Sequence, residues 1–174
     1  MDQQYCVFET GWGTTGFAAF ERRLTHLWLP GSIGDDMPAN GFRKNQRLMP
    51  ELRKRIVGYF DRGVMDGFCD VDILLDKSDF ARRVLLECRK LRPGETISYS
   101  ALGARAGSPK AARAVGSIMA NNPLPLIIPC HRVINAAGTA GGFMGSTVDT
   151  TGLKRRMLEL ERKIVTFTTG RPRK

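Results

Sequence analysis

The sequence predicts an α/β (α+β) protein with a small N-terminal sheet-plus-helix domain and a mostly helical C-terminal domain. Three observations predict it. Apolar segments flank a Gly- and Thr-rich turn in the first half, whereas helical periodicities dominate the second. The net charge is about −2 for residues 1–76 and +12 for the remainder. A composition shift near residue 77 therefore divides the chain into domains 1–77 and 78–174. Two short helical patterns in the second domain are expected to form a helix-turn-helix of winged-helix-like kind.

The first domain opens with two apolar segments around "GWGTTG", which predicts a β-hairpin. Gly, Pro and Asp make residues 30–41 a loop. Residues 47–60 follow a helical stripe, with Pro50 suited to the first turn of that helix. "VDILLD", residues 71–76, alternates apolar and polar positions and predicts a strand. The role we expect for this domain is structural.

The second domain begins with a helix capped by Ser78, whose apolar stripe includes Cys88 and ends before "RPGE". Two short helices follow. Residues 100–107 form the first, and Ser108 and Pro109 are expected to be the N-cap and first residue of the second. A glycine-containing turn between two helices is typical of a DNA-binding helix-turn-helix, although a plain helical hairpin has the same pattern.

A last helix is expected over residues 153–163, with Leu153, Met157 and Leu160 on its inner stripe. Glu161 lies at the edge of this stripe. By spacing alone we favour a surface position for it, the alternative being an inward carboxylate with a partner. The preceding residues 135–152 predict a loop, and the basic tail "TGRPRK", residues 169–174, is expected to be disordered.

Composition narrows the class of protein. The chain is 42% hydrophobic and has neither an apolar run of about 20 residues nor a signal-peptide pattern, which predicts an intracellular globular protein. The four cysteines are far apart in the sequence, which fits free thiols in a reducing compartment, with Cys88 as a core residue. The basic second half favours a polyanionic partner such as nucleic acid over a basic surface without a partner.

The segment "LIIPCHRVI" places a thiol, an imidazole and a guanidinium on three consecutive residues inside an apolar run. A buried structural Cys–His pair, a metal site and a nucleophilic site all compete here. The two histidines show no ligand spacing, so we expect no metal. For the nucleophilic interpretation, a base or a cation must favour the thiolate of Cys130.

Adjacent strand residues point to opposite faces, so direct contact between Cys130 and His131 requires the chain to leave strand geometry. Pro129 favours that departure, and a bridging water is the alternative. A carboxylate would orient the imidazole, and Glu161 is the best candidate among the acids of the second half. Arg132 is expected to pack or pair beneath the site.

With these residues assembled, the sequence resembles the O6-alkylguanine-DNA alkyltransferases, also called methylated-DNA–protein-cysteine methyltransferases. The resemblance is carried by "ISYSALGARAG", by "ARAVGSIMANNPLPLIIPCHRVI" and by "LKRRMLELE", which occur in the expected order. It covers about residues 80–133 and the last helix, and it is loose in the first half. "PCHRV" preceded by "NPLP" is highly specific to the family.

The resemblance implies direct-reversal DNA repair, in which an alkyl group moves irreversibly from guanine O6 to Cys130 and consumes the protein. His131 would draw the thiol proton through a water, and Glu161 would hold the imidazole. Asn122 would brace the turn behind the cysteine. Tyr99 would crowd the target phosphate and protonate the leaving base. No cofactor is implied, because the alkyl donor is the DNA.

The remaining implied residues contact DNA or the flipped base. Arg113 would fill the space left by the flipped nucleotide in double-stranded DNA that contains O6-alkylguanine. Further expected DNA contacts are Tyr99, Ser108, Lys110, Ala112 and Ser117. The expected pocket residues are Pro129, Val133, Ser146, Thr147 and Val148. The last three lie in a loop that departs from the family pattern, since it lacks the usual tyrosine.

The family further implies a monomer that lies in the cytoplasm, or in the nucleus of a eukaryote, and has no membrane partner. Two other functions compete. A non-catalytic lesion-binding relative would lack the nucleophile, so Cys130 counts against it. A cysteine hydrolase would use Cys130 and His131 without DNA, which leaves the basic half unexplained.

Overall fold

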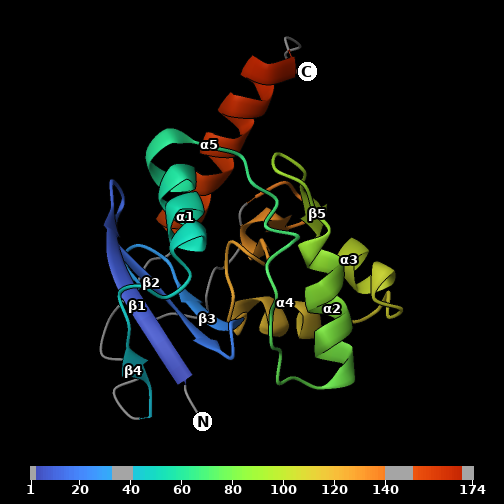
Figure 1. The fold of residues 1–174 in the computed structure, drawn as a ribbon. Coiled ribbons are helices and arrows are strands. Elements are labelled where there is room, and N and C mark those ends of the chain that lie inside the picture. The colour runs from blue at the N-terminus through green and yellow to red at the C-terminus, as the bar shows by residue number, and fades with distance from the viewer. Residues whose placement is uncertain (1–2, 33–40, 140–150, 170–174) are drawn as a thin grey trace. The chain divides into compact units, whose positions relative to one another are not determined.

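The computed structural model describes residues 3–32, 41–139 and 151–169, and it divides into two compact units. Unit 1 comprises Met1–Asp76 with Pro123–Leu126, and unit 2 comprises Lys77–Asn122 with Ile127–Lys174. The expected combination of a small sheet with one helix, followed by a mostly helical part, is confirmed (Figure 1).

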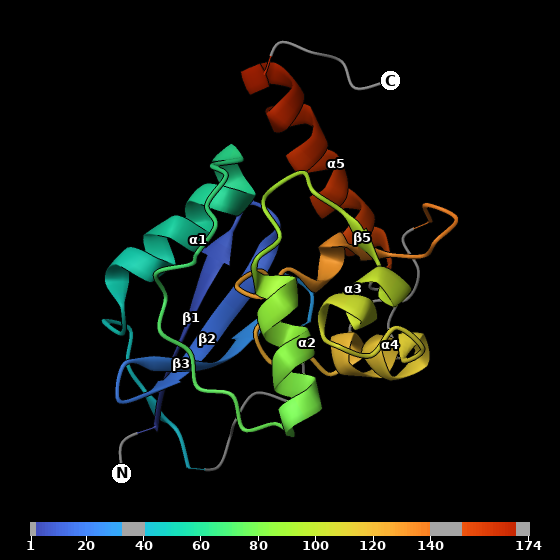
Figure 2. The ribbon, with the colours of Figure 1, turned by 90° about the vertical axis from the view of Figure 1, so that its right-hand side faces the viewer.

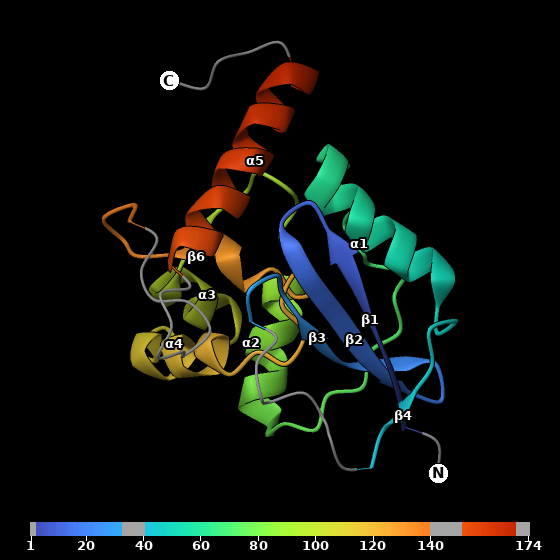
Figure 3. The same ribbon diagram turned by 90° about the vertical axis from the view of Figure 1, so that its left-hand side faces the viewer.

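Unit 1 is built on a four-stranded mixed sheet with one helix beside it (Figure 3). Its strands are β1 (Gln3–Thr10), β2 (Gly13–Phe20), β3 (Arg23–Trp28) and β4 (Arg43–Lys44), in the order β3-β2-β1-β4. β1, β2 and β3 pair antiparallel, whereas β4 runs parallel to β1. The predicted hairpin is therefore confirmed, with its turn at Gly11–Trp12.

The helix of unit 1, α1 (Pro50–Arg62), buries its apolar stripe, including Ile56 and Tyr59, in the core with Phe17 of β2. It begins three residues later than predicted. Met49 has a left-handed backbone (φ 42), and a residue that precedes proline is disfavoured in the α region. At the other end the left-handed Gly63 closes the helix by donating its N–H to the Tyr59 carbonyl.

The predicted strand over residues 71–76 is wrong. Only Ile73 makes a bridge, to Leu24 of β3. Leu24 donates its N–H to the Asp72 carbonyl and accepts one from Leu74 N, both at 2.8 Å. These two hydrogen bonds use both backbone groups of one residue, and the ladder does not extend beyond it. The alternation predicted half-buried side chains in an extended segment, but it contains no information on how many residues pair.

Unit 2 contains four α-helices and a two-stranded parallel sheet among its described residues. The helices are α2 (Asp79–Arg89), α3 (Tyr99–Arg105), α4 (Ala112–Ala120) and α5 (Thr151–Thr169). A short 3₁₀ helix, η1 (Cys130–Arg132), leads directly into β6 (Val133–Ile134), which pairs with β5 (Ile97–Ser98). Figure 2 shows α2, α3 and α4 packed together, which agrees with the expected helix-turn-helix.

Helix α2 begins after Ser78 as predicted, although the Ser78 side chain makes no capping hydrogen bond. Cys88 is fully buried, so its prediction as a core residue is confirmed. The predicted N-cap of the second short helix is wrong. That helix, α4, starts after Ala111, because Ser108–Ala111 forms a turn closed by the Ala111 N–H to the Ser108 carbonyl.

The close approach of this turn to α3 requires a glycine. A Cβ on Gly103 would lie 2.9 Å from the Ser108 carbonyl oxygen, which is shorter than a real contact. The Ser108 N–H in turn donates to the Gly103 carbonyl at 2.8 Å. These contacts keep Ser108 in the connection rather than at a helix N-terminus.

The predicted inner stripe of the last helix is confirmed at Met157 and wrong at Leu153 and Leu160. The fully buried side chains of α5 include those of Lys154, Met157 and Glu161, whereas Leu153 and Leu160 are only half-buried. The surface position favoured for Glu161 is therefore also wrong. Apolar periodicity missed this orientation because two of the inward positions are charged, and their partners come from distant segments. None of the described helices is long and apolar enough to cross a membrane.

Candidate active site around Cys130

The candidate site lies in unit 2, where the chain turns sharply after Pro129. The Cys130 N–H donates to the Ile128 carbonyl at 2.7 Å, and the Arg132 N–H donates to the Pro129 carbonyl at 2.9 Å. These bonds set Cys130, His131 and Arg132 on one turn of 3₁₀ helix. The chain thus leaves strand geometry, as the Pro129 position predicted.

Asn122 supports this turn from inside. It is buried, and its side-chain Nδ2 donates to the Ile128 carbonyl at 2.8 Å. Burial raises the pKa of the Cys130 thiol, while a hydrogen bond from Asn122 and the charge of Lys154 oppose that rise. The thiol is 1% exposed and therefore needs a nearby base and cation to react as a thiolate.

His131 is fully buried and is held by the last helix. Its Nε2 lies 2.8 Å from Oε1 of Glu161. A carboxylate accepts hydrogen bonds, so the neutral imidazole carries its hydrogen on Nε2 and its lone pair on Nδ1. Nδ1 is buried and has no hydrogen-bond partner among the described residues. That nitrogen is consequently the atom that can accept a proton.

Arg132 anchors the same carboxylate from the opposite side. Its Nε donates to Oε2 of Glu161 at 2.9 Å and its NH2 donates to Oε1 at 2.7 Å, a bidentate pair. Its NH1 donates to the Leu91 carbonyl at 2.6 Å, and the Gly94 N–H donates to Oε2 of Glu161 at 3.0 Å. The pairing expected for Arg132 beneath the site is confirmed.

These contacts decide the protonation states. Burial alone would raise the pKa of Glu161, but the hydrogen bonds and charges of His131 and Arg132 outweigh it and hold that pKa well below its usual range. Burial lowers the pKa of His131, and the Arg132 charge acts in the same direction, against the hydrogen bond and charge of Glu161. The arrangement at neutral pH is a neutral imidazole beside an ionised Arg–Glu pair.

Lys154 and Tyr99 complete the cluster, and the sequence reasoning missed Lys154. The Lys154 ammonium is fully buried, donates to the Val133 carbonyl at 2.6 Å and lies 3.4 Å from the Tyr99 hydroxyl. Burial lowers the pKa of Lys154 to about 8, and burial also raises the pKa of Tyr99. The signal for Lys154 was its place seven residues before Glu161, on the same helix stripe.

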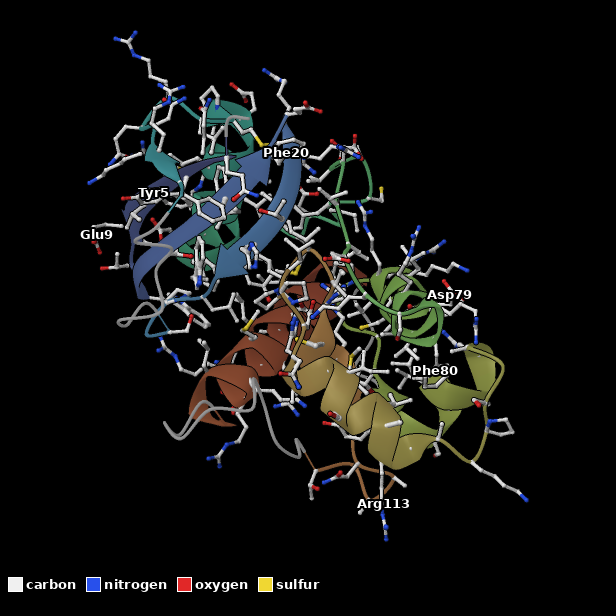
Figure 4. All side chains as sticks on the ribbon, turned by 90° about the horizontal axis from the view of Figure 1, so that it is seen from below. Tyr5, Glu9, Phe20, Asp79, Phe80 and Arg113 are labelled. Carbon is white, nitrogen blue, oxygen red and sulfur yellow. The ribbon has the colours of Figure 1, made fainter. Side chains whose placement is uncertain are left out.

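The expected DNA-contacting residues lie on and before α4. A hollow of about 310 Å³ is lined by Tyr99, Ala112 and Arg113, with Asn135 at its side. Arg113 is exposed and projects away from the helix (Figure 4). Lys110 and Ser117 are exposed and Ser108 is half-buried, but these three do not line the hollow.

Of the expected pocket residues, Pro129 and Val133 are buried on either side of η1. Ser146, Thr147 and Val148 lie outside the described residues. Among the described residues no group of three or more His, Cys, Asp or Glu side chains could hold a metal ion.

Comparison with known proteins identifies the family. Residues 79–163 match the family model "6-O-methylguanine DNA methyltransferase, DNA binding domain". A methylated-DNA–protein-cysteine methyltransferase of Methanosarcina barkeri is 32% identical over 158 residues, which are 90% of this chain and 96% of the relative. The chain belongs to the methylated-DNA–protein-cysteine methyltransferase family. The resemblance seen in the sequence is thereby confirmed.

Other relatives of the methyltransferase family support the assignment over different lengths. The Cricetulus griseus methyltransferase is 49% identical over 73 residues, which are 41% of this chain and only 35% of the relative. The chain thus matches about a third of the length of such relatives. The crystal structure of Mycobacterium tuberculosis OGT in complex with DNA is 29% identical, with a TM-score of 0.80 over 92% of this chain and 93% of that one.

Proposed function

We propose that this protein repairs DNA by moving an alkyl group from O6 of guanine to the Sγ atom of Cys130. The observation that carries the proposal is the buried arrangement of Cys130, His131 and Glu161 on η1 and α5, in a chain of the methyltransferase family. A thiol, a neutral base and an orienting carboxylate are the components that nucleophilic displacement requires.

In the proposed reaction His131 accepts the Cys130 proton at Nδ1 through a water, and the thiolate attacks the alkyl carbon. The carbon–sulfur bond forms as the bond from that carbon to guanine O6 breaks. Tyr99 donates a proton to the leaving base, and Lys154 beside its hydroxyl stabilises the phenolate that results. Overall the thiol loses one proton and guanine gains one, so no cofactor is needed.

The product is a thioether, which is a very poor leaving group. Cys130 therefore stays alkylated, and each protein molecule acts once as a methylated-DNA–protein-cysteine S-methyltransferase. Support for the first step of this chemistry comes from His131, whose imidazole is held at Nε2 by Glu161 and keeps Nδ1 for the thiol proton. The proposal makes the protein a reagent that is consumed with the lesion.

The proposed partner is double-stranded DNA that contains O6-alkylguanine, bound by a monomer through α3 and α4. Residues from 77 onward have a net charge of about +12, which favours phosphate contacts without sequence reading. Arg113, exposed beside the hollow lined by Tyr99, would occupy the stack after the base flips out. Ser108, Lys110, Ala112 and Ser117 would contact the backbone nearby.

We further assign a structural role to domain 1–77 and the repair chemistry to domain 78–174. The pocket would be completed by Pro129 and Val133 with residues 146–148. The expected location is the cytoplasm, or the nucleus in a eukaryotic cell.

The experiment compares wild type with Cys130→Ser, using duplex DNA that carries a labelled O6-methylguanine. We expect one label transferred per wild-type molecule and none to Cys130→Ser, with full transfer to the matched control Cys69→Ser, whose thiol is exposed. Tight lesion binding without transfer would favour the lesion-binding alternative. Released product in many turnovers without DNA would favour a hydrolase.

A further inference from the structure

The side-chain partners of the Glu161 carboxylate include the imidazole of His131 that it orients and the positively charged guanidinium of Arg132. Arg132 contributes two hydrogen bonds to it, one to each oxygen, and His131 contributes one. Arg132 and Glu161 side chains are 2% and 1% exposed, so water screens their attraction very little. The guanidinium cannot lose its proton within a protein, and its charge is therefore permanent.

A carboxylate whose charge is not balanced would draw a proton onto the imidazole and keep it there. A protonated His131 has no lone pair on Nδ1 and could not accept the thiol proton. The charged groups that act on His131 are Arg132 on its own turn and Glu161 and Lys154 on α5. The titratable thiols nearby are that of the adjacent Cys130 and that of Cys88 on α2, which interacts with Cys130. Only Glu161 among them is an anion at neutral pH. Whether Arg132 neutralises the Glu161 charge therefore decides the protonation state of the His131 imidazole.

The position of Arg132 is fixed from a third direction. Its NH1 donates to the Leu91 carbonyl, and the nearby Gly94 N–H donates to Glu161. The turn after α2 thus holds both members of the ion pair, with a left-handed Gly94 (φ 79) that allows the N–H to point at the carboxylate. These two contacts hold Arg132 and Glu161 through backbone groups, independently of His131.

We infer that Arg132 is a positioning residue for the proposed transfer reaction, because it neutralises Glu161 and thereby keeps His131 an unprotonated base. Glu161 then orients the imidazole through Nε2 without raising its affinity for a second proton. This inference rests on the proposed function, in which His131 accepts the thiol proton. It assigns to Arg132 an effect on reactivity beyond its contribution to packing.

The test measures the pKa of His131 by nuclear magnetic resonance of the imidazole nitrogens. His26 of unit 1 is the one other histidine in the sequence and serves as an internal reference. In Arg132→Met, we expect the His131 pKa to rise by about one unit or more, while that of His26 stays unchanged. In Arg132→Met combined with Glu161→Gln, the His131 pKa should return to or below its wild-type value.

The transfer rate constant from O6-methylguanine DNA is measured over the same pH range. The pH midpoint of transfer should move upward by as much as the His131 pKa rises, and at pH values below that midpoint Arg132→Met should react about tenfold more slowly for each unit of the rise. A folded Arg132→Met protein with an unchanged His131 pKa would overturn the inference. So would a raised His131 pKa that leaves the pH midpoint of transfer unmoved.

Arg132→Gln covers the case in which Arg132→Met does not fold. The Gln amide can donate a hydrogen bond to the carboxylate but has no charge, so a rise of the His131 pKa is expected here too. An unchanged His131 pKa in Arg132→Gln would then contradict the inference. Because the titration needs no DNA, absence of transfer by wild type would count against the proposed function alone.

Discussion

Replacing Glu161 by Gln should destabilise unit 2 far more than an ordinary substitution on the last helix. The Glu161 carboxylate accepts hydrogen bonds from His131, from two nitrogens of Arg132 and from the Gly94 backbone. The Gln side chain keeps the shape but removes the charge and replaces one acceptor by a donor. Arg132, 2% exposed, would be left as a buried cation without a counter-ion.

The magnitude follows from that unpaired charge. Breaking a buried ion pair by removing one partner costs about 3–5 kcal/mol, which compares with about 5–15 kcal/mol for the whole stability of a domain. We therefore expect Glu161→Gln to lower the unfolding free energy by about 3–5 kcal/mol. Glu159→Gln, two residues away on the exposed face of α5, should change it by less than about 0.5 kcal/mol.

Urea denaturation followed by far-ultraviolet circular dichroism measures the difference, because unit 2 contains α2, α3, α4 and α5. Trp12 and Trp28, the two tryptophans of the chain, lie in unit 1, so their fluorescence follows that unit separately. A loss below about 1 kcal/mol for Glu161→Gln at an unchanged denaturant slope would refute the reasoning, since such a loss is typical of an exposed pair.

Three other perturbations test the site. His131 and Glu161 both have lowered pKa values in the folded state, so their stabilisation is present above their unfolded values of 6.5 and 4.5. Unfolding free energy should consequently fall as pH drops through that window, and a flat acid titration would contradict this. Lys154, with its pKa lowered from 10.5 to about 8, acts with the same sign at high pH: stability should rise between pH 8 and about 10, and Lys154→Met should abolish that rise. Arg113→Ala should weaken duplex binding and reduce the salt dependence of that binding by about one charge. Transfer from the free modified base should not fall. An unchanged salt dependence would show that Arg113 makes no phosphate contact.

Local sequence patterns predicted the elements that depend on local chemistry. The Gly/Thr turn predicted the β1–β2 hairpin, Pro50 predicted the start of α1 within three residues, and Pro129 predicted the departure from strand geometry at Cys130. Each of these outcomes is set by backbone restrictions of residues within the segment itself. The strand over residues 71–76 failed because pairing length depends on the partner strand.

The site was harder to predict because its orientation is set by polar contacts between distant segments. Apolar spacing assigned Leu153 and Leu160 to the inner face of the last helix, whereas the structure buries Lys154 and Glu161 there. Their partners, the Val133 carbonyl and the His131–Arg132 pair, lie more than twenty residues earlier in the chain. The spacing of apolar residues along one helix contains no information on polar contacts with distant segments. An inward Glu161 was indicated only by the need for a carboxylate beside His131 and by the family resemblance.

The most direct test of the central claim is the mass of the Cys130 peptide after incubation with duplex DNA containing O6-methylguanine. The proposed reaction predicts a gain of one methyl group on Cys130 alone, saturating at one group per protein molecule. The other three cysteines, Cys6, Cys69 and Cys88, should stay unmodified, because none of them is the nucleophile of the proposed site. No gain on Cys130, or a gain on any other cysteine that persists in Cys130→Ser, would contradict the account.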